Sequence, residues 1–233
     1  MGKRIIQQRR GRGTSTYRVK PSSYKFKIGY PSKLEGEGKV IKLLNSPGHT
    51  TPLAKVKYKK GTFYMPAFKG MIEGQKIEFC QGDIKEGNVF KLKNIPVKTK
   101  VYNIESRPGD GGKFIRSGGS YAEITRFIDG WVFVMMPSKK EKKFRADSRA
   151  TVGMIAGAGR LEKPILKAGK MHYIKKSKNR LWPRTSAVKM NVIDHPFGSG
   201  RAKNVKSKIA KRNSPPGRKV GLLRPKRTGR KKR

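Results

Sequence analysis

The residues best suited to acid–base chemistry are three histidines, His49, His172 and His195. His195 stands in the run Asp194-His195-Pro196, where an enzyme would use its imidazole as a general base oriented by a carboxylate. Adjacent residues seldom pair in that way. The setting favours an imidazole that is hydrogen-bonded to or stacked on a partner within a rigid Pro-Phe-Gly turn. Because the other two histidines lie far away in sequence, no catalytic constellation is predicted.

Thiol, metal and cofactor chemistry is poorly supported. Cys80 is the only cysteine, which excludes an intramolecular disulfide and any zinc site built from several thiolates, and indicates a reducing, intracellular setting. Metal ligands do not recur at a recognisable spacing. Residues 156–159 (AGAG) have part of a dinucleotide-binding pattern, but no third glycine follows and no αβ context is predicted. We therefore expect no metal, no cofactor and no enzymatic activity.

The composition points instead to a polyanionic partner. The chain holds 58 lysine and arginine residues against 14 aspartate and glutamate residues among 233, a formal net charge of +44 at pH 7. Ordinary soluble domains carry the two signs in rough balance. A compact body with this excess would repel itself unless a partner supplied the opposite charge. RNA and DNA are the natural candidates, because their phosphates bind lysine and arginine with release of counterions.

A membrane location is not expected from the sequence. No stretch approaches the roughly 20 apolar residues of a membrane span, and residues 1–12 lack the apolar core of a signal peptide. No basic amphipathic helix with a clean apolar face is evident either. We expect a soluble, cytoplasmic protein without a membrane partner.

The charge is unevenly distributed along the chain. Residues 1–33 hold ten basic and no acidic residues, residues 34–175 hold 28 basic and 13 acidic ones, and residues 176–233 hold 20 basic residues and a single acid, Asp194. Only the middle segment has the mixed charges of an ordinary domain surface. The two ends cannot bury enough apolar surface to offset backbone ordering. They are predicted to be basic extensions, disordered until RNA organises them.

The middle segment has a hydrophobic period near two with turn residues at short intervals, which predicts strands. Leu53–Tyr58 alternates with lysines, and the run 62–65 follows a turn at Lys60-Gly61 as a hairpin partner. A second hairpin is predicted at Asp129-Gly130, because this dipeptide favours a primed two-residue turn. Its strands are the runs 121–127 and 131–136. Further runs complete a set of about eight strands, at 40–44, 76–79, 89–92 and 101–104.

Two small β-barrels are the simplest packing for these strands, one over residues 34–95 and one over residues 96–175. The predicted class is thus mainly β, with extended basic N- and C-terminal arms over 1–33 and 176–233. A single larger sandwich is the alternative, and the pattern decides only weakly between the two.

Two features of the sequence have open interpretations. Residues 108–112 and 117–120 are glycine-rich and flank Lys113 and Arg116. They are either flexible hairpin ends or a basic loop whose amides and side chains lie against phosphates. Trp182, among lysines in Trp182-Pro183-Arg184, is either part of a small local core or a stacking platform for a base or sugar.

Ordered motifs run through nearly the whole chain. They are residues 7–14 (QQRRGRGT), 108–110 (PGD), 150–157 (ATVGMIAG), 162–170 (EKPILKAGK), 182–184 (WPR), 190–191 (MN), 194–198 (DHPFG), 216–221 (PGRKVG) and 227–230 (RTGR). Any one of them would be weak evidence, whereas the series in this order is highly specific. The chain resembles the universal L-two family of large-subunit ribosomal proteins, with the archaeal and eukaryotic branch, and the archaeal one above all, fitting best.

The resemblance implies an OB-like barrel followed by an SH3-like barrel, with extensions threaded into large-subunit rRNA. It also implies early rRNA binding, support of subunit association, and a C-terminal arm directed towards the region around an RNA-based peptidyl-transferase centre. The implied partners are large-subunit rRNA, other ribosomal proteins and the small subunit. His195 matches a family histidine once thought to take part in peptide-bond formation, a reaction now understood to be catalysed by RNA.

Three departures from the family pattern stand out. Gly198-Ser199-Gly200 replaces three glycines, and residues 202–204 (AKN) replace a His-Gln-His run. A serine follows glycine-like backbone only with a negative or strained φ, so RNA contact at Ser199 is in question. Residues 184–189 (RTSAVK) replace an Arg-x-Arg-Gly pattern, so Arg184 is carried over without a second arginine.

Taken together, the sequence predicts electrostatic anchoring by the extensions followed by recognition of RNA shape. The main alternative is a basic protein that packages nucleic acid, and an rRNA-acting enzyme is a third class for which no cofactor site is found. The predicted RNA-binding residues are Arg9, Arg10, Arg12, Lys113, Arg116, Arg160, Lys170, Lys178, Arg180, Trp182, Arg184, Asn191, His195, Arg201, Arg218, Lys219, Arg227 and Arg230.

Overall fold

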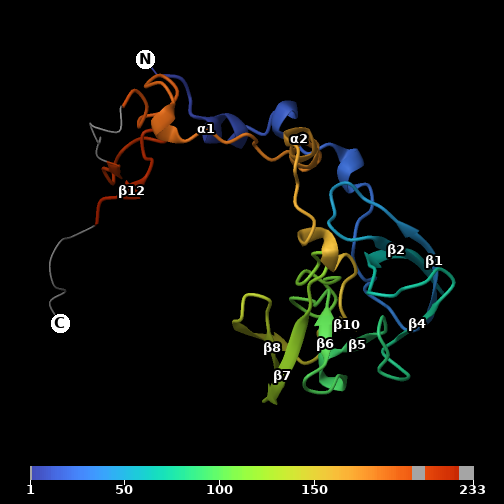
Figure 1. The fold of residues 1–233 in the computed structure, drawn as a ribbon. Coiled ribbons are helices and arrows are strands. Elements are labelled where there is room, and N and C mark those ends of the chain that lie inside the picture. The colour runs from blue at the N-terminus through green and yellow to red at the C-terminus, as the bar shows by residue number, and fades with distance from the viewer. Residues whose placement is uncertain (1, 201–207, 226–233) are drawn as a thin grey trace, which may run out of the picture. The chain divides into compact units, whose positions relative to one another are not determined.

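The computed structural model describes residues 2–200 and 208–225, and its contacts divide the chain into two compact units (Figure 1). The larger unit spans residues 20–178, and the smaller unit combines residues 1–19 with 179–233. The charge distribution had placed the boundaries after residues 33 and 175. The N-terminal division falls earlier because Ile28 forms a β-bridge with Tyr64 and Tyr30 is buried in the core of the larger unit.

The larger unit is built on one ten-stranded sheet, so the mainly β prediction is confirmed. Its order is β3-β2-β1-β4-β5-β10-β6-β7-β8-β9, and every pairing is antiparallel except that of β4 with β5. The strands are β1 (Gly36–Leu44), β2 (Leu53–Tyr58), β3 (Gly61–Pro66), β4 (Lys76–Phe79), β5 (Val89–Lys91), β6 (Lys100–Tyr102), β7 (Ala122–Ile128), β8 (Trp131–Met135), β9 (Glu141–Arg145) and β10 (Arg149–Val152).

The two predicted hairpins are present. Ile128 pairs with Trp131 across Asp129-Gly130, whose φ angles of 45° and 74° are those of a primed turn, as the sequence predicted. In the first hairpin Tyr58 pairs with Gly61. The turn there is Lys59-Lys60, one residue earlier than predicted, because Gly61 already belongs to β3.

Two hydrophobic cores lie within this continuous sheet. One is formed by side chains of β1 to β4 together with residues such as Tyr30, Tyr102 and Ile155, and the other by side chains of β5 to β10 and their connections. They correspond to two barrel-like halves, although no closed barrel is formed by the residues that the structure describes. The halves are joined where β4 pairs in parallel with β5, at Phe79 and Val89.

The helices are short. α2 (Ala168–Ser177) ends the larger unit, and its Ser177 hydroxyl donates a hydrogen bond to the Pro47 carbonyl (3.4 Å). The 3₁₀ helices are η1 (Ser15–Tyr17), η2 (Pro21–Tyr24), η3 (Leu92–Asn94), η4 (Ala158–Leu161) and η5 (Ala187–Lys189). Within residues 2–200 and 208–225, no helix has the length and apolar character needed to cross a membrane.

The smaller unit contains α1 (Ile6–Gly11) and a parallel pair of two-residue strands, β11 (Ile209–Ala210) and β12 (Leu222–Leu223). Among its described residues the buried apolar side chains are those of Ile5 and Ala210. The amide of Lys3 donates to the Ile193 carbonyl (2.7 Å), so the blue N-terminal segment runs beside the orange C-terminal one in Figure 1. Backbone hydrogen bonds, more than an apolar core, hold this unit together.

Candidate nucleic-acid interface

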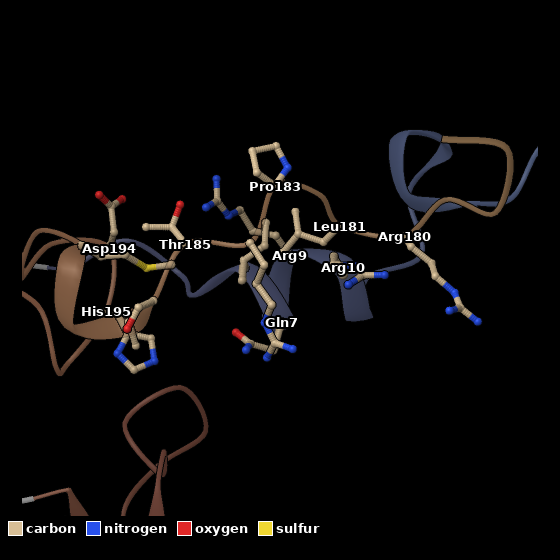
Figure 2. Close-up of a pocket in the computed structure, with 14 residues that line it drawn as sticks. Gln7, Arg9, Arg10, Arg180, Leu181, Pro183, Thr185, Asp194 and His195 are labelled. Carbon is tan, nitrogen blue, oxygen red and sulfur yellow. The ribbon is translucent and has the colours of Figure 1, made fainter. Parts of the chain in front are cut away.

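A groove of about 900 Å³ lies in the smaller unit, between α1 and the segment 180–195 (Figure 2). Five of the predicted RNA-binding residues line it, namely Arg9, Arg10, Arg180, Arg184 and His195. The four arginines are called the groove arginines below. The remaining lining residues are Ile6, Gln7, Leu181, Pro183, Thr185, Ser186, Ala187, Met190 and Asp194. Segments of the N- and C-terminal extensions therefore build one site, with Arg10 and Arg180 170 residues apart in sequence.

Local contacts at α1 set the positions of two groove arginines. Ile5 is buried immediately before the helix, and its amide donates to Oε1 of Gln8 (3.2 Å), which satisfies one of the free amides at the helix start. Arg9 and Arg10 follow on the next turn, both exposed. Arg10 Nη2 donates to the Asn179 carbonyl (3.4 Å), so this guanidinium also ties α1 to the start of the C-terminal segment.

The cations are spread along the groove and do not converge on one point. Figure 2 shows Arg180 extending away at one end, Arg9 and Arg10 in the middle, and Asp194 with His195 at the other end. A row of separated guanidinium groups fits an extended polyanion better than a single small anion. Each can make two hydrogen bonds to a phosphate or stack on a base, which a lysine cannot reproduce.

The charge of this unit is almost uncompensated. Asp194 is the only acidic residue in residues 1–19 and 179–233. All ion pairs found among the described residues lie in the larger unit, from Lys76–Glu37 to the buried pair Arg149–Glu105. The groove arginines thus have no carboxylate partner in the described part of the chain. Their counter-charge must come from solution ions or from a bound polyanion.

His195 is held inside a tight turn, with 8% of its surface exposed. Its Nδ1 accepts a hydrogen bond from the Phe197 amide (3.0 Å), its carbonyl accepts from Gly198, and its ring contacts the Phe197 ring edge-on at 5.1 Å. In a neutral imidazole whose Nδ1 accepts, the proton is on Nε2, which can only donate. The geometry therefore leaves Nε2 as a hydrogen-bond donor and occupies the accepting nitrogen, Nδ1, within the turn.

The two residues after Phe197 close the loop over residues 190–199. A Cβ at Gly198 would lie 2.3 Å from the Asn191 carbonyl oxygen, so this close approach requires glycine. Ser199 has φ 55°, its amide donates to the Met190 carbonyl (2.9 Å), and its Oγ accepts from the Val192 amide (2.9 Å). The serine thus keeps a glycine-like backbone, and its hydroxyl supplies a hydrogen bond inside the loop.

The glycine-rich loops of the larger unit are used within the protein. Arg116 is half-buried, its Nε donates to Asn103 Oδ1 (2.9 Å), and its Nη2 donates to the carbonyls of Ile28 (3.3 Å) and Gly112. Burial lowers the pKa of this guanidinium. The Gly118 amide donates to Thr50 Oγ1 (3.1 Å). These donors hold loops together in the structure.

The other predicted residues are dispersed. Lys113 pairs with Asp110 (3.5 Å), and the exposed Arg160 donates from Nε to the Gly118 carbonyl (3.4 Å). Trp182 is half-buried within the segment that lines the groove. The Asn191 carbonyl accepts a hydrogen bond from the His195 amide. Exposed cations elsewhere are Arg12 after α1, Lys170 in α2, and Arg218 and Lys219 in the turn 215–219, while Lys178 is half-buried. Arg201, Arg227 and Arg230, like residues 202–204, lie outside the described residues.

Sequence reasoning missed the neutral groove residues and the buried cluster around Arg149. Leu181, Pro183 and Thr185 line the groove between arginines, and no local pattern marks them. Among the described residues no group of three or more histidine, cysteine or carboxylate side chains is placed to hold a metal ion.

Comparison with known proteins shows which family the chain belongs to. The model of the family described as ribosomal proteins L2, C-terminal domain, matches residues 85–217. The large ribosomal subunit protein uL2 of Hyperthermus butylicus is 44% identical over the full length of both chains. Its counterparts in Methanococcus vannielii and Methanococcus maripaludis are each 43% identical over 99% of this chain and 100% of theirs. The chain belongs to the uL2 family.

Membership of the uL2 family confirms the resemblance predicted from the ordered motifs, including its archaeal character. The match covers both structural units, since the archaeal uL2 chains align with the whole sequence. The DHPFG run of this uL2-family chain forms the buried His195 turn, and Pro183 and Arg184 of its WPR run line the groove. Residues of two C-terminal family motifs therefore meet at this groove.

Proposed function

We propose that this chain is a structural constituent of the large ribosomal subunit and that it binds large-subunit rRNA through the groove of its smaller unit. The full-length match to archaeal uL2 proteins carries the first part. The row of groove arginines without carboxylate partners among the described residues supports the second. Other ribosomal proteins are its expected neighbours, and the ribosome in the cytoplasm is its expected location.

The proposed mechanism begins with charge and ends with shape. The groove arginines and the other exposed cations of the extensions neutralise phosphates and release counterions, which supplies most of the affinity. The folded larger unit holds the extensions in register, and several modest contacts in one chain reinforce one another. Folded RNA is then recognised by backbone geometry and unstacked bases more than by base-pair sequence.

Two finer roles follow from the family resemblance and belong to this proposal. The chain helps the large and small subunits associate, and its C-terminal arm supports the region around the RNA-based peptidyl-transferase centre. His195 acts there as part of the architecture and not as a general base. The support for this is its Nδ1, which accepts the Phe197 amide, and its buried position in the turn.

Competition between nucleic acids tests the proposal against the alternative of a DNA-packaging protein. The full chain is bound to labelled large-subunit rRNA at physiological salt and challenged with equal masses of unlabelled rRNA or duplex DNA. An rRNA constituent should be displaced efficiently by folded rRNA and poorly by duplex DNA. Equal displacement by both would favour the packaging function, because contacts to phosphates alone do not distinguish the two.

A further inference from the structure

The outer face of β7, β8 and β9 carries aromatic and basic side chains in register. Trp131 and Phe133 lie on the same face of β8, opposite the side on which Val132 and Val134 are buried. Trp131 pairs across the strands with Ile128 and Arg145, and Phe133 pairs with Arg126 and Lys143. Cross-strand partners point to the same side of a sheet. The aromatic face is defined here as Arg126, Ile128, Trp131, Phe133, Lys143 and Arg145.

All side chains of the aromatic face except the half-buried Phe133 are exposed, and each of its two rings is paired with a cation. Trp131 has 38% of its surface exposed and Ile128 has 43%. Lys143 Nζ lies 4.9 Å from the centroid of the Trp131 ring, and the Arg126 guanidinium carbon lies 4.7 Å from that of Phe133. Such contacts hold each cation beside a ring face, where it remains within reach of a ligand that lies on the ring.

Protection of the sheet edge explains only part of this arrangement. β9 is the last strand of the sheet, and lysines on an edge strand discourage pairing with another chain. That accounts for Lys143 and Arg145. It does not account for an exposed tryptophan and isoleucine on the same face, which increase the risk of aggregation unless a partner covers them.

We propose that the aromatic face binds unpaired RNA nucleotides, with bases stacked on Trp131 and Phe133 and phosphates held by Arg126, Lys143 and Arg145. The inference rests on the proposed function and names a second, separate RNA contact in the larger unit. Proteins that bind single-stranded nucleic acids on a sheet combine aromatic rings, on which bases stack, with cations that bind the phosphate backbone. Two carboxylates lie at one end of this face, Glu123 of β7 and Glu141 of β9, both cross-strand partners of Met135, and Glu141 pairs with Arg126 (2.9 Å). Positive charges outnumber negative charges on this face. This excess favours RNA over an apolar protein surface that carries few acidic groups.

Fluorescence of the full chain tests the inference directly. The chain has two tryptophans, so Trp182→Phe leaves Trp131 as the sole reporter without altering the aromatic face. The probes are a short oligouridylate and inorganic polyphosphate, which has the charge but no bases. Oligouridylate should quench Trp131 emission through stacking, and polyphosphate should not. This measurement needs no substitution in the face itself.

Affinity for oligouridylate gives the second test, at raised salt where phosphate contacts by the extensions are weakened. Trp131→Ala should weaken binding by roughly 5- to 150-fold, the loss of one base–ring stack, and Trp131→Phe should restore most of it. Phe127→Ala is the matched control. Phe127 is 42% exposed on the same hairpin but pairs with the buried Val132, so it lies on the opposite face, and its loss should leave binding unchanged.

The inference is overturned if oligouridylate binds without changing Trp131 emission, if polyphosphate quenches this emission equally, or if Trp131→Ala and Phe127→Ala behave alike. Each of these results leaves rRNA binding by the groove intact. Failure of the unaltered chain to bind rRNA at all would instead refute the proposed function, and the two failures are therefore distinguishable.

Discussion

Replacing Arg149 with methionine should strongly destabilise the larger unit. Arg149 in β10 donates to Glu105 Oε1 from Nε (3.1 Å) and Nη2 (2.6 Å), and to the Pro31 carbonyl from Nη1 (2.9 Å). Glu105 is completely buried, and 6% of the Arg149 surface is exposed. Methionine keeps the length of the side chain without any donor. The Glu105 carboxylate would then retain only the amides of residues 149 (2.8 Å) and Gly111 (3.2 Å).

The expected loss follows from the burial of the pair. Removing one partner of a buried ion pair costs about 3–5 kcal/mol, because an uncompensated charge remains in a low-dielectric interior. At 1.36 kcal/mol per factor of ten this is roughly a 150- to 5000-fold shift of the unfolding equilibrium. For a unit of this size the melting temperature should fall by roughly 6–20 °C.

Urea denaturation monitored by Trp131 emission in the Trp182→Phe background measures this loss, since Trp131 lies in the larger unit. The matched control is the double variant Glu105→Gln with Arg149→Met, which removes both charges while an amide oxygen still accepts from the backbone. It should be more stable than Arg149→Met alone. A cost for Arg149→Met below about 1 kcal/mol, as for an exposed pair, would refute this reasoning.

Three further predictions concern the site and its surroundings. Changing all four groove arginines to glutamine should make the plot of log affinity for rRNA against log salt less steep by roughly 3, since each phosphate contact contributes about 0.7–0.9 to the magnitude of its slope. Changing the same four residues to lysine should preserve the slope. An unchanged slope with glutamine would show that the groove is not used. Single-turnover peptide-bond formation by fully assembled ribosomes carrying His195→Gln should stay within a few-fold of the unaltered rate, and a loss on the order of 100-fold in particles of unchanged composition would make His195 a general base. Burial, Arg116 and Lys178 lower the pKa of His49 from its usual 6.5, so the unfolded chain binds this proton more readily and stability should fall as the pH drops below 6.5. Denaturation at a series of pH values should show a shallower acid-side decline for His49→Gln.

Most of the sheet could be predicted from period-two alternation and turn chemistry. β2 and β4 were predicted with the bounds they have, and the Asp129-Gly130 turn with its type. β9 reads EKKFR, with one apolar residue, and β10 reads RATV, so neither carries an alternation strong enough to be recognised. Their strand conformation depends on pairing with β8 and with β5 and β6, which are distant in sequence.

The candidate site was predictable in residue type but not in arrangement. Charge and family motifs selected the groove arginines and His195, yet nothing local shows that residues 9 and 10 face residues 180 and 184. Arg116 shows that sequence also does not reveal which contacts a basic residue makes within the fold. Its place between glycine-rich loops left two interpretations open, and no local pattern indicates that its Nε and Nη2 donate to Asn103 and to the Ile28 carbonyl, which tertiary structure brings together.

The most direct test of the central claim is sedimentation of cell extract through a gradient that separates the ribosomal subunits, with immunodetection of this chain. The account predicts that the chain travels with the large subunit, with joined ribosomes and with polysomes, and that it follows the large subunit when low magnesium separates the two. A chain that remains at the top of the gradient, or that sediments with DNA and is released by DNase, would contradict it.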